Sequence, residues 1–281
     1  MIVFKKIKDI KKYLEHQKIS GLQIGLVPTM GALHQGHLSL IEMSKKSTEI
    51  TVSSIFVNPT QFNDSMDFEK YPITIENDIL LLEKAGCDVL FLPSAEEIYP
   101  DGTALTAAYD LGYLETILEG KFRPNHFQGV CQVVHRLLEI VHADRLFLGQ
   151  KDYQQCLVVK KMIQLSGIQT KLKIGNTLRE TSGLAMSSRN MRLSDFDKQK
   201  ATAIYESLLF IQKNINTTPV FELKQQATTD LLNSGFEKVD YVEICDAITL
   251  QPIINNKKPT KKVAVIAAFL NGVRLIDNLI L

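Results

Sequence analysis

The sequence contains no tryptophan, few cysteines and no marked excess of either charge. Its four cysteines, Cys87, Cys131, Cys156 and Cys245, lie far apart and form no Cys-x-x-Cys pair. This spacing argues against a zinc cluster or a disulfide framework and favours buried, reduced thiols. The 32 basic and 31 acidic residues give a net charge of +1, so the chain lacks the basic excess typical of proteins that bind long nucleic acids.

Long apolar runs are also missing. No segment approaches the ~20 consecutive apolar residues that a membrane-spanning helix needs. Lysines begin at Lys5, but no apolar stretch of signal-peptide length follows them. Instead Ile7, Ile10 and Leu14 recur at helical spacing, which predicts an amphipathic first helix. We therefore expect a cytoplasmic enzyme without a membrane partner.

Through its first two thirds, the chain alternates short apolar runs with helical patterns. We expect strands at Ile24–Val27, Ile50–Val57, Val89–Leu92, Arg145–Leu148 and Leu172–Ile174. We expect helices around Leu38–Ile41, Ile79–Leu82, Gln128–Val141 and Leu157–Leu165. This alternation predicts an α/β fold, a Rossmann-like parallel sheet with helices on both faces. Ligands of such sheets bind at the carboxyl ends of the strands.

The pattern changes near Asn176. A loop rich in small polar residues, TSGLAMSSRNMRLS, is followed by helical stretches at Asp195–Lys213 and Val220–Asn233. Strand-like runs then occupy Val239–Cys245, Val263–Phe269 and Val273–Ile276, with Gly272 in a turn between the last two. We therefore expect two domains, a Rossmann-like domain over residues 1–175 and a smaller C-terminal α+β domain over residues 176–281.

The first strand runs directly into the segment Pro28–His37, which contains neither Gly-x-Gly-x-x-Gly nor Gly-x-x-x-x-Gly-Lys-[Ser/Thr]. Two histidines, His34 and His37, stand three residues apart where a helix should begin. Ring N–H groups, backbone N–H groups and the helix dipole would face one anion there. Two ordinary surface histidines are the plainer alternative, but the place between a strand and a helix favours a functional pair.

This context resembles the HIGH signature of class I nucleotidyltransferases. Those enzymes pair the signature with a later KMSKS-like loop, for which Ala185–Arg189 stands in the right order. The segments VPTMGALHQGHLSL, SIFVNPTQF, KFRPNHFQGV, LFLGQKDYQQ and AMSSRNMRLS are similar, in this order, to those of the pantothenate synthetase (pantoate–β-alanine ligase) family. The resemblance spans nearly the whole chain.

The resemblance implies a reaction in two steps. Pantoate would be activated by ATP to an acyl adenylate, with release of pyrophosphate, and β-alanine would then displace AMP. Magnesium would accompany ATP, because Mg²⁺ is usually bound through substrate phosphates with few protein ligands. The first domain would bind nucleotide and pantoate and form a homodimer, and the second would act as a lid.

The resemblance also implies roles for individual residues. Catalytic roles would belong to His37, His34 and Lys151. ATP would be bound by Met30, Gly31, Ala32, Leu33, His34, Gln35, Gly36, His37, Gly149, Gln150, Lys151, Asp152, Leu178, Met186, Ser187, Ser188 and Arg189. Substrate would be bound by Asn58, Gln61, Gln155, Arg123 and His126. Amide side chains suit the hydroxyls of pantoate, because each offers a donor and an acceptor without charge.

The sequence departs from the family pattern at two places. Gln150 stands where the family usually has glutamate, which puts in doubt any role for an acid there but not the roles of Lys151 and Asp152. Asn125 stands where glycine is commoner, and asparagine tolerates left-handed backbone angles.

Two other functions compete with this interpretation. One is another class I adenylyltransferase, acting on a phosphorylated or nicotinamide substrate, and the NPTQF and GQKDYQQ segments argue against it. The other is a nucleotide-binding sensor without catalysis. The presence of His34, His37, Lys151 and Arg189 argues against that sensor.

Overall fold

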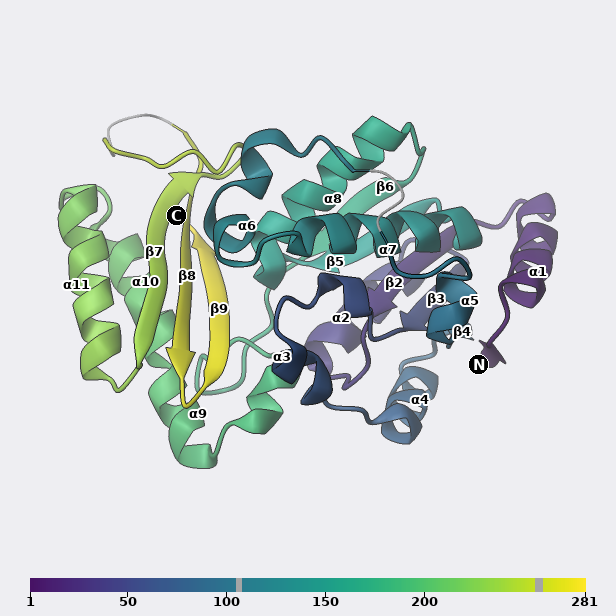
Figure 1. The fold of residues 1–281 in the computed structure, drawn as a ribbon, viewed down its shortest axis with the longest axis horizontal. Helices are drawn as coiled ribbons and strands as arrows, with labels where there is room; N and C mark the ends of the chain where they lie inside the picture. The colour runs from purple at the N-terminus through teal and green to yellow at the C-terminus, as the bar shows by residue number, and fades with distance from the viewer. Residues whose placement is uncertain (105–107, 256–259) are drawn as a thin grey trace. The chain divides into compact units, whose positions relative to one another are not determined.

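The computed structural model describes residues 1–104, 108–255 and 260–281 (Figure 1). The chain divides into two compact units. The first unit comprises Met1–Gly149 and Gln155–Asn176, and the second comprises Gln150–Gln154 and Thr177–Leu281. None of the helices in these described ranges combines the length and apolar character that crossing a lipid bilayer requires.

The first unit is built on a six-stranded parallel sheet with the order β1-β4-β3-β2-β5-β6. The strands are β1 Ile2–Phe4, β2 Ile24–Thr29, β3 Ile50–Ile55, β4 Val89–Phe91, β5 Arg145–Gly149 and β6 Lys171–Gly175. The predicted parallel sheet is therefore confirmed. Only β1 was not expected, because three residues at a sheet edge are too few to show a periodic pattern.

Helices cover both faces of this sheet, as predicted. Side chains alternate along β2, so Ile24 and Leu26 enter one apolar cluster and Val27 enters another. The first cluster includes side chains of α1 Ile7–Ile19, α7 His126–Val141 and α8 Tyr153–Ser166. The second includes side chains of α2 Gln35–Lys45 and α4 Ile75–Lys84. Short helices occupy α3 Ser65–Glu69, α5 Ala95–Ile98 and α6 Leu118–Phe122.

The strand order places a topological switch point beside β2. The chain continues from β2 to β3 on one side, whereas β5 pairs with the other side of β2. In open parallel sheets the ligand crevice lies at such a point, outside the carboxyl ends of the strands. In the first unit these ends are Thr29 in β2 and Gly149 in β5.

The second unit contains an antiparallel sheet with the order β7-β8-β9. Its strands are β7 Lys238–Asp246, β8 Lys262–Leu270 and β9 Val273–Ile280, and its helices are α9 Asp195–Ala201, α10 Ala203–Asn214 and α11 Val220–Asn233. Apolar side chains of α10 and α11 pack with those of the sheet in one cluster. Gly272 has a φ of 68°, which confirms the predicted turn.

One predicted helix is divided in the structure. The stretch Asp195–Lys213 forms α9 and α10, which meet at Thr202. The Thr202 hydroxyl donates to the carbonyl oxygen of Gln199 at 2.8 Å. Such a side-chain bond competes with the helical backbone pattern and bends helices. The apolar spacing continues through the break, so the sequence pattern alone did not reveal it.

Candidate active site

The turn after β2 is held by a buried carboxylate that sequence reasoning missed. Gly31 and Ala32 have φ values of 84° and 48°, so both adopt left-handed backbone angles. Asp78 in α4 accepts hydrogen bonds from the backbone N–H of Ala32 at 2.9 Å and of Leu33 at 2.8 Å. The Asp78 side chain is inaccessible to solvent. The carboxylate thus fixes the backbone that leads into α2.

His34 and His37 form a reciprocal cap at the start of α2. Nδ1 of His34 accepts from the backbone N–H of Gly36 at 3.1 Å, and Nδ1 of His37 accepts from the backbone N–H of His34 at 3.3 Å. A neutral imidazole that accepts at Nδ1 carries its proton on Nε2. The two ring centroids lie 4.0 Å apart. The cap therefore gives each neutral ring an Nε2–H donor at a helix N-terminus, the arrangement suited to an anion.

The predicted substrate residue Gln61 lies beside Met30. Its Nε2 donates to Sδ of Met30 at 3.0 Å, and its Oε1 accepts from Nδ2 of Asn58 at 3.1 Å. Asn58 is 1% exposed and also bonds the hydroxyl of Tyr99, at 2.9 Å, and the carbonyl oxygen of Gly129, at 3.2 Å. The structure thus brings Met30, Asn58 and Gln61 together, with Asn58 beneath Gln61 and inside the protein.

Arg123 and His126 contact the backbone of the same residue, Gln61. Nδ1 of His126 lies 2.7 Å from the carbonyl oxygen of Gln61, which can only accept. Nδ1 therefore carries a proton, and in the neutral ring Nε2 accepts from Arg123 at 3.1 Å. Arg123 also donates to the carbonyl oxygen of Gln61, at 3.4 Å. Both side chains hold the Gln61 backbone, a role that their sequence position did not indicate.

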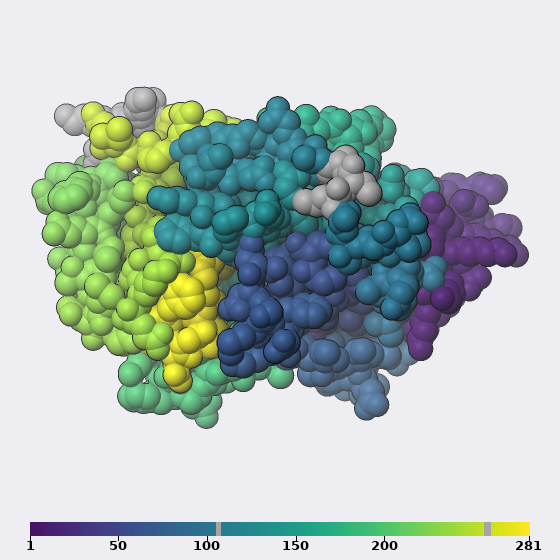
Figure 2. Space-filling model, viewed as in Figure 1, coloured from purple at the N-terminus to yellow at the C-terminus, as the bar shows by residue number. Residues whose placement is uncertain are grey.

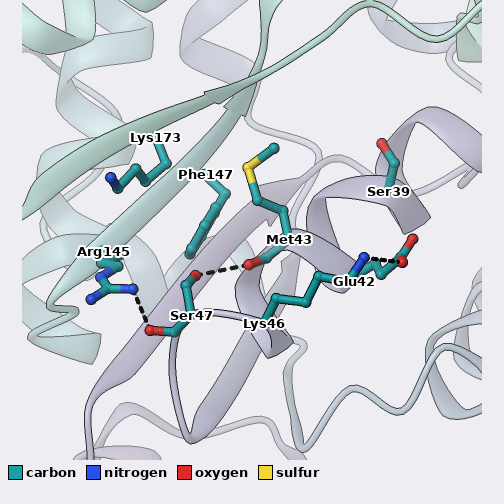
Figure 3. A pocket seen from close by; sticks show the side chains of 8 residues that line it. All are labelled: Ser39, Glu42, Met43, Lys46, Ser47, Arg145, Phe147 and Lys173. Atoms are coloured by element: carbon teal, nitrogen blue, oxygen red, sulfur yellow. Dashed lines mark hydrogen bonds and ion pairs between the residues drawn. The ribbon is translucent and has the colours of Figure 1, made fainter.

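Two cavities in the described part of the first unit can be compared with the predicted site. The first, of about 240 Å³, lies at the carboxyl ends of β2, β3 and β4 and is lined by Met30, Gly31, Ile55, Phe56, Val57, Ile73, Thr74, Ile75, Asp78, Leu92, Pro93 and Ala95. The second, of about 420 Å³, lies among α2, β5 and β6 (Figure 3). Its lysine Lys46 pairs with Glu42 at 2.6 Å, and Arg145 donates to the carbonyl oxygen of Ser47. Of the two, the first contains predicted site residues in its lining.

The remaining predicted parts of the first unit are Gly149, Gln155 and the segment after NPTQF, which differ in their place in the fold and in their exposure. Gly149 ends β5, and a Cβ atom built there would meet no atom within 4 Å. Gln155 lies half-buried in the first turn of α8. The segment Ser65–Glu69, which follows the NPTQF segment, lies at the surface (blue in Figure 2) and exposes Met66 and Phe68.

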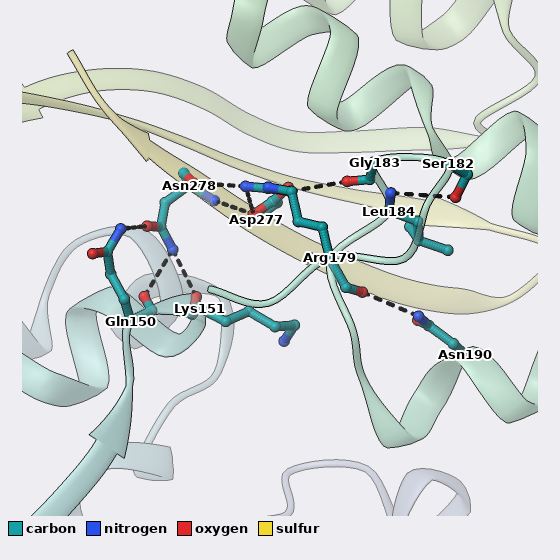
Figure 4. A network of polar contacts seen from close by, with 10 residues as sticks. Gln150, Lys151, Arg179, Ser182, Gly183, Leu184, Asn190, Asp277 and Asn278 are labelled. Carbon is teal, nitrogen blue, oxygen red and sulfur yellow. Dashed lines mark hydrogen bonds and ion pairs between the residues drawn. The ribbon is translucent and has the colours of Figure 1, made fainter. Parts of the chain in front are cut away.

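In the second unit, the predicted nucleotide residues Gln150, Lys151 and Asp152 form a short 3₁₀ turn. The ammonium group of Lys151 lies 3.8 Å from Oδ1 of Asp152. The backbone carbonyl groups of Gln150 and Lys151 both accept from the side-chain amide of Asn278 in β9 (Figure 4). Asn278 is thus a further residue of this region that the sequence patterns did not single out.

The predicted triphosphate loop follows a small hairpin in the same unit. Residues Arg179 and Ala185 form an antiparallel bridge, and the backbone N–H of Met186 donates to the carbonyl oxygen of Leu178 at 3.0 Å. Ser187 then caps the 3₁₀ turn Ser188–Arg192 with its hydroxyl. The hairpin therefore holds Leu178 next to Met186, two residues for which ATP contacts were predicted.

The cysteine thiols and the possible metal ligands bear on which kinds of chemistry the protein can perform. Burial raises the pKa of Cys87 to about 11 and those of Cys131 and Cys245 to about 12, which keeps these groups protonated and weakly nucleophilic near neutral pH. Across the ranges that the structure describes, no group of three His, Cys, Asp or Glu side chains could hold a metal ion.

Comparison with known proteins agrees with these features. The family model for pantoate-beta-alanine ligase matches residues 2–280. The pantothenate synthetase of Cytophaga hutchinsonii is 44% identical over 100% of this chain and 99% of its own length, and that of Flavobacterium psychrophilum is 42% identical over 99% of each.

Solved structures resemble the chain over its whole length. The pantothenate synthetase of Thermus thermophilus superposes with a TM-score of 0.92 at 37% identity, covering 99% of both chains. The pantoate-beta-alanine ligase of Francisella tularensis, solved in complex with beta-gamma ATP and beta-alanine, has a TM-score of 0.84 at 38% identity and covers 100% of this chain and 97% of its own. The chain therefore belongs to the pantoate–β-alanine ligase family.

Proposed function

We propose that this chain joins pantoate to β-alanine at the expense of ATP, giving pantothenate, AMP and pyrophosphate through a pantoyl adenylate. The observation that carries the proposal is the pair His34 and His37, which offers two Nε2–H donors at a helix N-terminus beside the topological switch point. Family membership over residues 2–280 supports the same reaction.

The first step is transfer of the adenylyl group. An oxygen of the pantoate carboxylate forms a bond to the α-phosphorus of ATP, and the bond to the β-phosphate oxygen breaks, so that pyrophosphate leaves. We assign the nucleotide to Met30–His37 and Gly149 of the first unit, with His34 and His37 donating to phosphate oxygens. Fixed donors aimed at oxygens whose charge changes are a principal source of catalysis.

In the second unit we assign Gln150, Lys151 and Asp152 to the nucleotide, with Lys151 toward the phosphates and Asp152 toward the ribose. Leu178 lies by the adenine, and Met186–Arg189 closes over the triphosphate. Arg189 suits this role, because a guanidinium group offers a planar fork of donors to phosphate oxygens. Mg²⁺ binds with ATP and takes its ligands mainly from the phosphates.

For pantoate we assign direct contacts to Gln61 and Gln155. The amide of Gln61 is held by Met30 and Asn58 beside the first cavity, so it needs little reorganisation to meet a substrate hydroxyl. The hydrogen bonds of three further predicted residues lead us to refine their roles. Asn58, Arg123 and His126 each bond Gln61, so we assign them to holding Gln61 in place and not to direct contact with the substrate.

The second step forms the amide. The β-alanine amine attacks the acyl carbon of the adenylate, the bond to the AMP oxygen breaks, and the amine loses a proton. No side-chain nucleophile is required, which agrees with the burial of Cys131. Positioning the two reactants supplies much of the rate in such a reaction.

A pantoate-dependent exchange of label between pyrophosphate and ATP tests this function. We expect exchange with ATP, Mg²⁺ and pantoate in the absence of β-alanine. Exchange that requires a phosphorylated or nicotinamide substrate would identify a different adenylyltransferase. Binding of ATP without any exchange would identify a nucleotide sensor.

We also propose that the protein acts in the cytoplasm as a homodimer formed through the first unit. This rests on the family resemblance. Light scattering at micromolar concentration distinguishes a dimer from a monomer, and a strictly monomeric mass would refute the assignment.

A further inference from the structure

The side chain of Asn278 connects β9 to the turn that carries Lys151. Asn278 is 2% exposed, and its Nδ2 donates to the carbonyl oxygen of Gln150 at 2.9 Å and to that of Lys151 at 2.8 Å (Figure 4). Because carbonyl oxygens only accept, these two bonds fix which end of the Asn278 amide is the NH₂ group. The Oδ1 atom must then face the other way.

Gln150 completes this arrangement. Its Nε2 donates to Oδ1 of Asn278 at 3.2 Å, so the side chain and the carbonyl group of Gln150 both bond the same amide. A glutamate at position 150 would instead bring a carboxylate to an oxygen that can only accept. The glutamine found in this chain is therefore matched to Asn278.

The preceding residue, Asp277, fixes the hairpin that leads to the triphosphate loop. Arg179 donates to both Asp277 oxygens, at 2.5 and 3.1 Å, and also to the carbonyl oxygens of Gly183, at 3.2 Å, and Asn278, at 3.3 Å. Burial raises the pKa of the Asp277 carboxyl, and the hydrogen bond and charge of Arg179 oppose this. Arg179 thus ties the hairpin Leu178–Met186 to the same two residues of β9.

We propose that Asn278 and Asp277 are positioning residues for the adenylation step: Asn278 sets the backbone of the Lys151 turn, and Asp277, through Arg179, sets the hairpin before Met186–Arg189. The proposal rests on the proposed function, because it takes Lys151 as a phosphate ligand. The sheet does not require these side chains, since β9 pairs with β8 through its backbone. Asn278 donates to the turn at Gln150 and Lys151, and Asp277 accepts from Arg179, so each side chain bonds a segment outside the sheet.

The variant Asn278→Ala tests this, with Asn271→Ala as its matched control. Asn271 lies in the turn between β8 and β9, has a φ of 48° and bonds Asp197, so its replacement also costs stability but leaves the Lys151 turn untouched. We expect Asn278→Ala to lower kcat for pyrophosphate release by about 10- to 100-fold, since small displacements of reacting groups have effects of this size. The control should keep the wild-type kcat with a similar loss in melting temperature.

A double variant separates positioning from a general structural effect. If Asn278 acts through Lys151, adding Asn278→Ala to Lys151→Ala causes no further loss of kcat, because residues that act as a unit are not additive. Losses that multiply, or an Asn278→Ala enzyme within about threefold of the control, would overturn the proposal. Gln150→Glu should lower kcat by about fivefold, which corresponds to the loss of one hydrogen bond. An unchanged kcat would show that Gln150 does not help to position the Lys151 turn.

The outcomes also distinguish this inference from the proposed function. An active Lys151→Ala enzyme would show that Lys151 is not a phosphate ligand, and the assignment of the nucleotide would fail. An inactive Lys151→Ala enzyme together with a fully active Asn278→Ala enzyme would contradict only the positioning role of β9.

Discussion

His34 and His37 use the same ring nitrogen for the same purpose. In each, Nδ1 accepts a backbone N–H at the start of α2, so that Nε2 carries the proton of the neutral ring. The sequence predicted a pair of donors at this helix N-terminus. The capping geometry adds which nitrogen of each ring donates, and this follows only from the structure.

The histidine pair can be tested without removing the cap. Asparagine is a favoured N-cap residue and glutamine suits the third position of a capping box, so His34→Asn and His37→Gln preserve the local structure while removing the ring Nε2–H. We expect both variants to form pyrophosphate more slowly in single-turnover experiments. The exposed His16 in α1 provides a control, His16→Ala. Normal single-turnover rates in either variant would remove that histidine from the mechanism.

Lys151→Ala should fold normally and lose activity. The Lys151 charge would stabilise phosphate oxygens, and loss of one such fixed donor typically costs about 100- to 1,000-fold in rate. The measurement is kcat/KM for ATP, with circular dichroism to confirm folding. Lys160→Ala, on the exposed surface of α8, is the matched control. Activity within about threefold of wild type would show that the lysine has no such role.

The amides of Gln61 and Gln155 should matter more for pantoate than for ATP. Removing either leaves a substrate hydroxyl or carboxylate without its partner, at a cost of about 1–3 kcal/mol in binding. Titration calorimetry of Gln61→Ala and Gln155→Ala with each ligand separates the two effects. If both ligands were weakened equally, these residues would belong elsewhere in the site.

At the scale of structural elements, Asp78 links α4 to the turn after β2, and its removal should lower the stability of the protein. Asp78 is fully buried and receives hydrogen bonds from two backbone N–H groups and from the hydroxyl of Thr74. Asp78→Ala would leave these donors unsatisfied and destabilise the protein by about 2–5 kcal/mol, since each orphaned group costs about 1–3 kcal/mol. Chemical denaturation measures this loss, and a change below about 1 kcal/mol would show that Asp78 does not hold the turn after β2.

Asp78 also shows what the sequence could not reveal. The strands of the parallel sheet were predictable, because buried strands such as β4 and β5 contain short apolar runs. Asp78, by contrast, lies 45 residues or more along the chain from the N–H groups that it binds, and nothing in its local pattern distinguishes it from a surface acid. The same holds for Arg179 and Asp277, whose contact spans 98 positions.

The candidate site also has features that the sequence predicted and features that only the structure revealed. The motifs after β2 and β5 lie at the carboxyl ends of their strands, because the parallel fold requires it, and this much followed from periodicity and from the family resemblance. The supporting roles of Asn58, Arg123 and His126 depended on side-chain geometry. A motif identifies such residues as a group but does not say whether each contacts the ligand or its neighbour.

For the molecule as a whole, the proposed reaction has two steps and retains its intermediate between them. A mixed anhydride hydrolyses when water reaches it, so a segment must exclude water after the first step. We propose the MSSR loop of the second unit and the segment after NPTQF in the first unit for this purpose. Both are rich in polar or small residues, and the latter exposes the side chains of Met66 and Phe68.

The most direct test is a quenched-flow measurement with labelled ATP, Mg²⁺ and pantoate in the absence of β-alanine. We expect a burst of about one pyrophosphate per active site, followed by a stall while the acyl adenylate stays bound and protected from water. Addition of β-alanine should then release AMP and pantothenate without further ATP. Formation of pyrophosphate that strictly requires β-alanine would contradict the two-step scheme and indicate a concerted reaction or a different one.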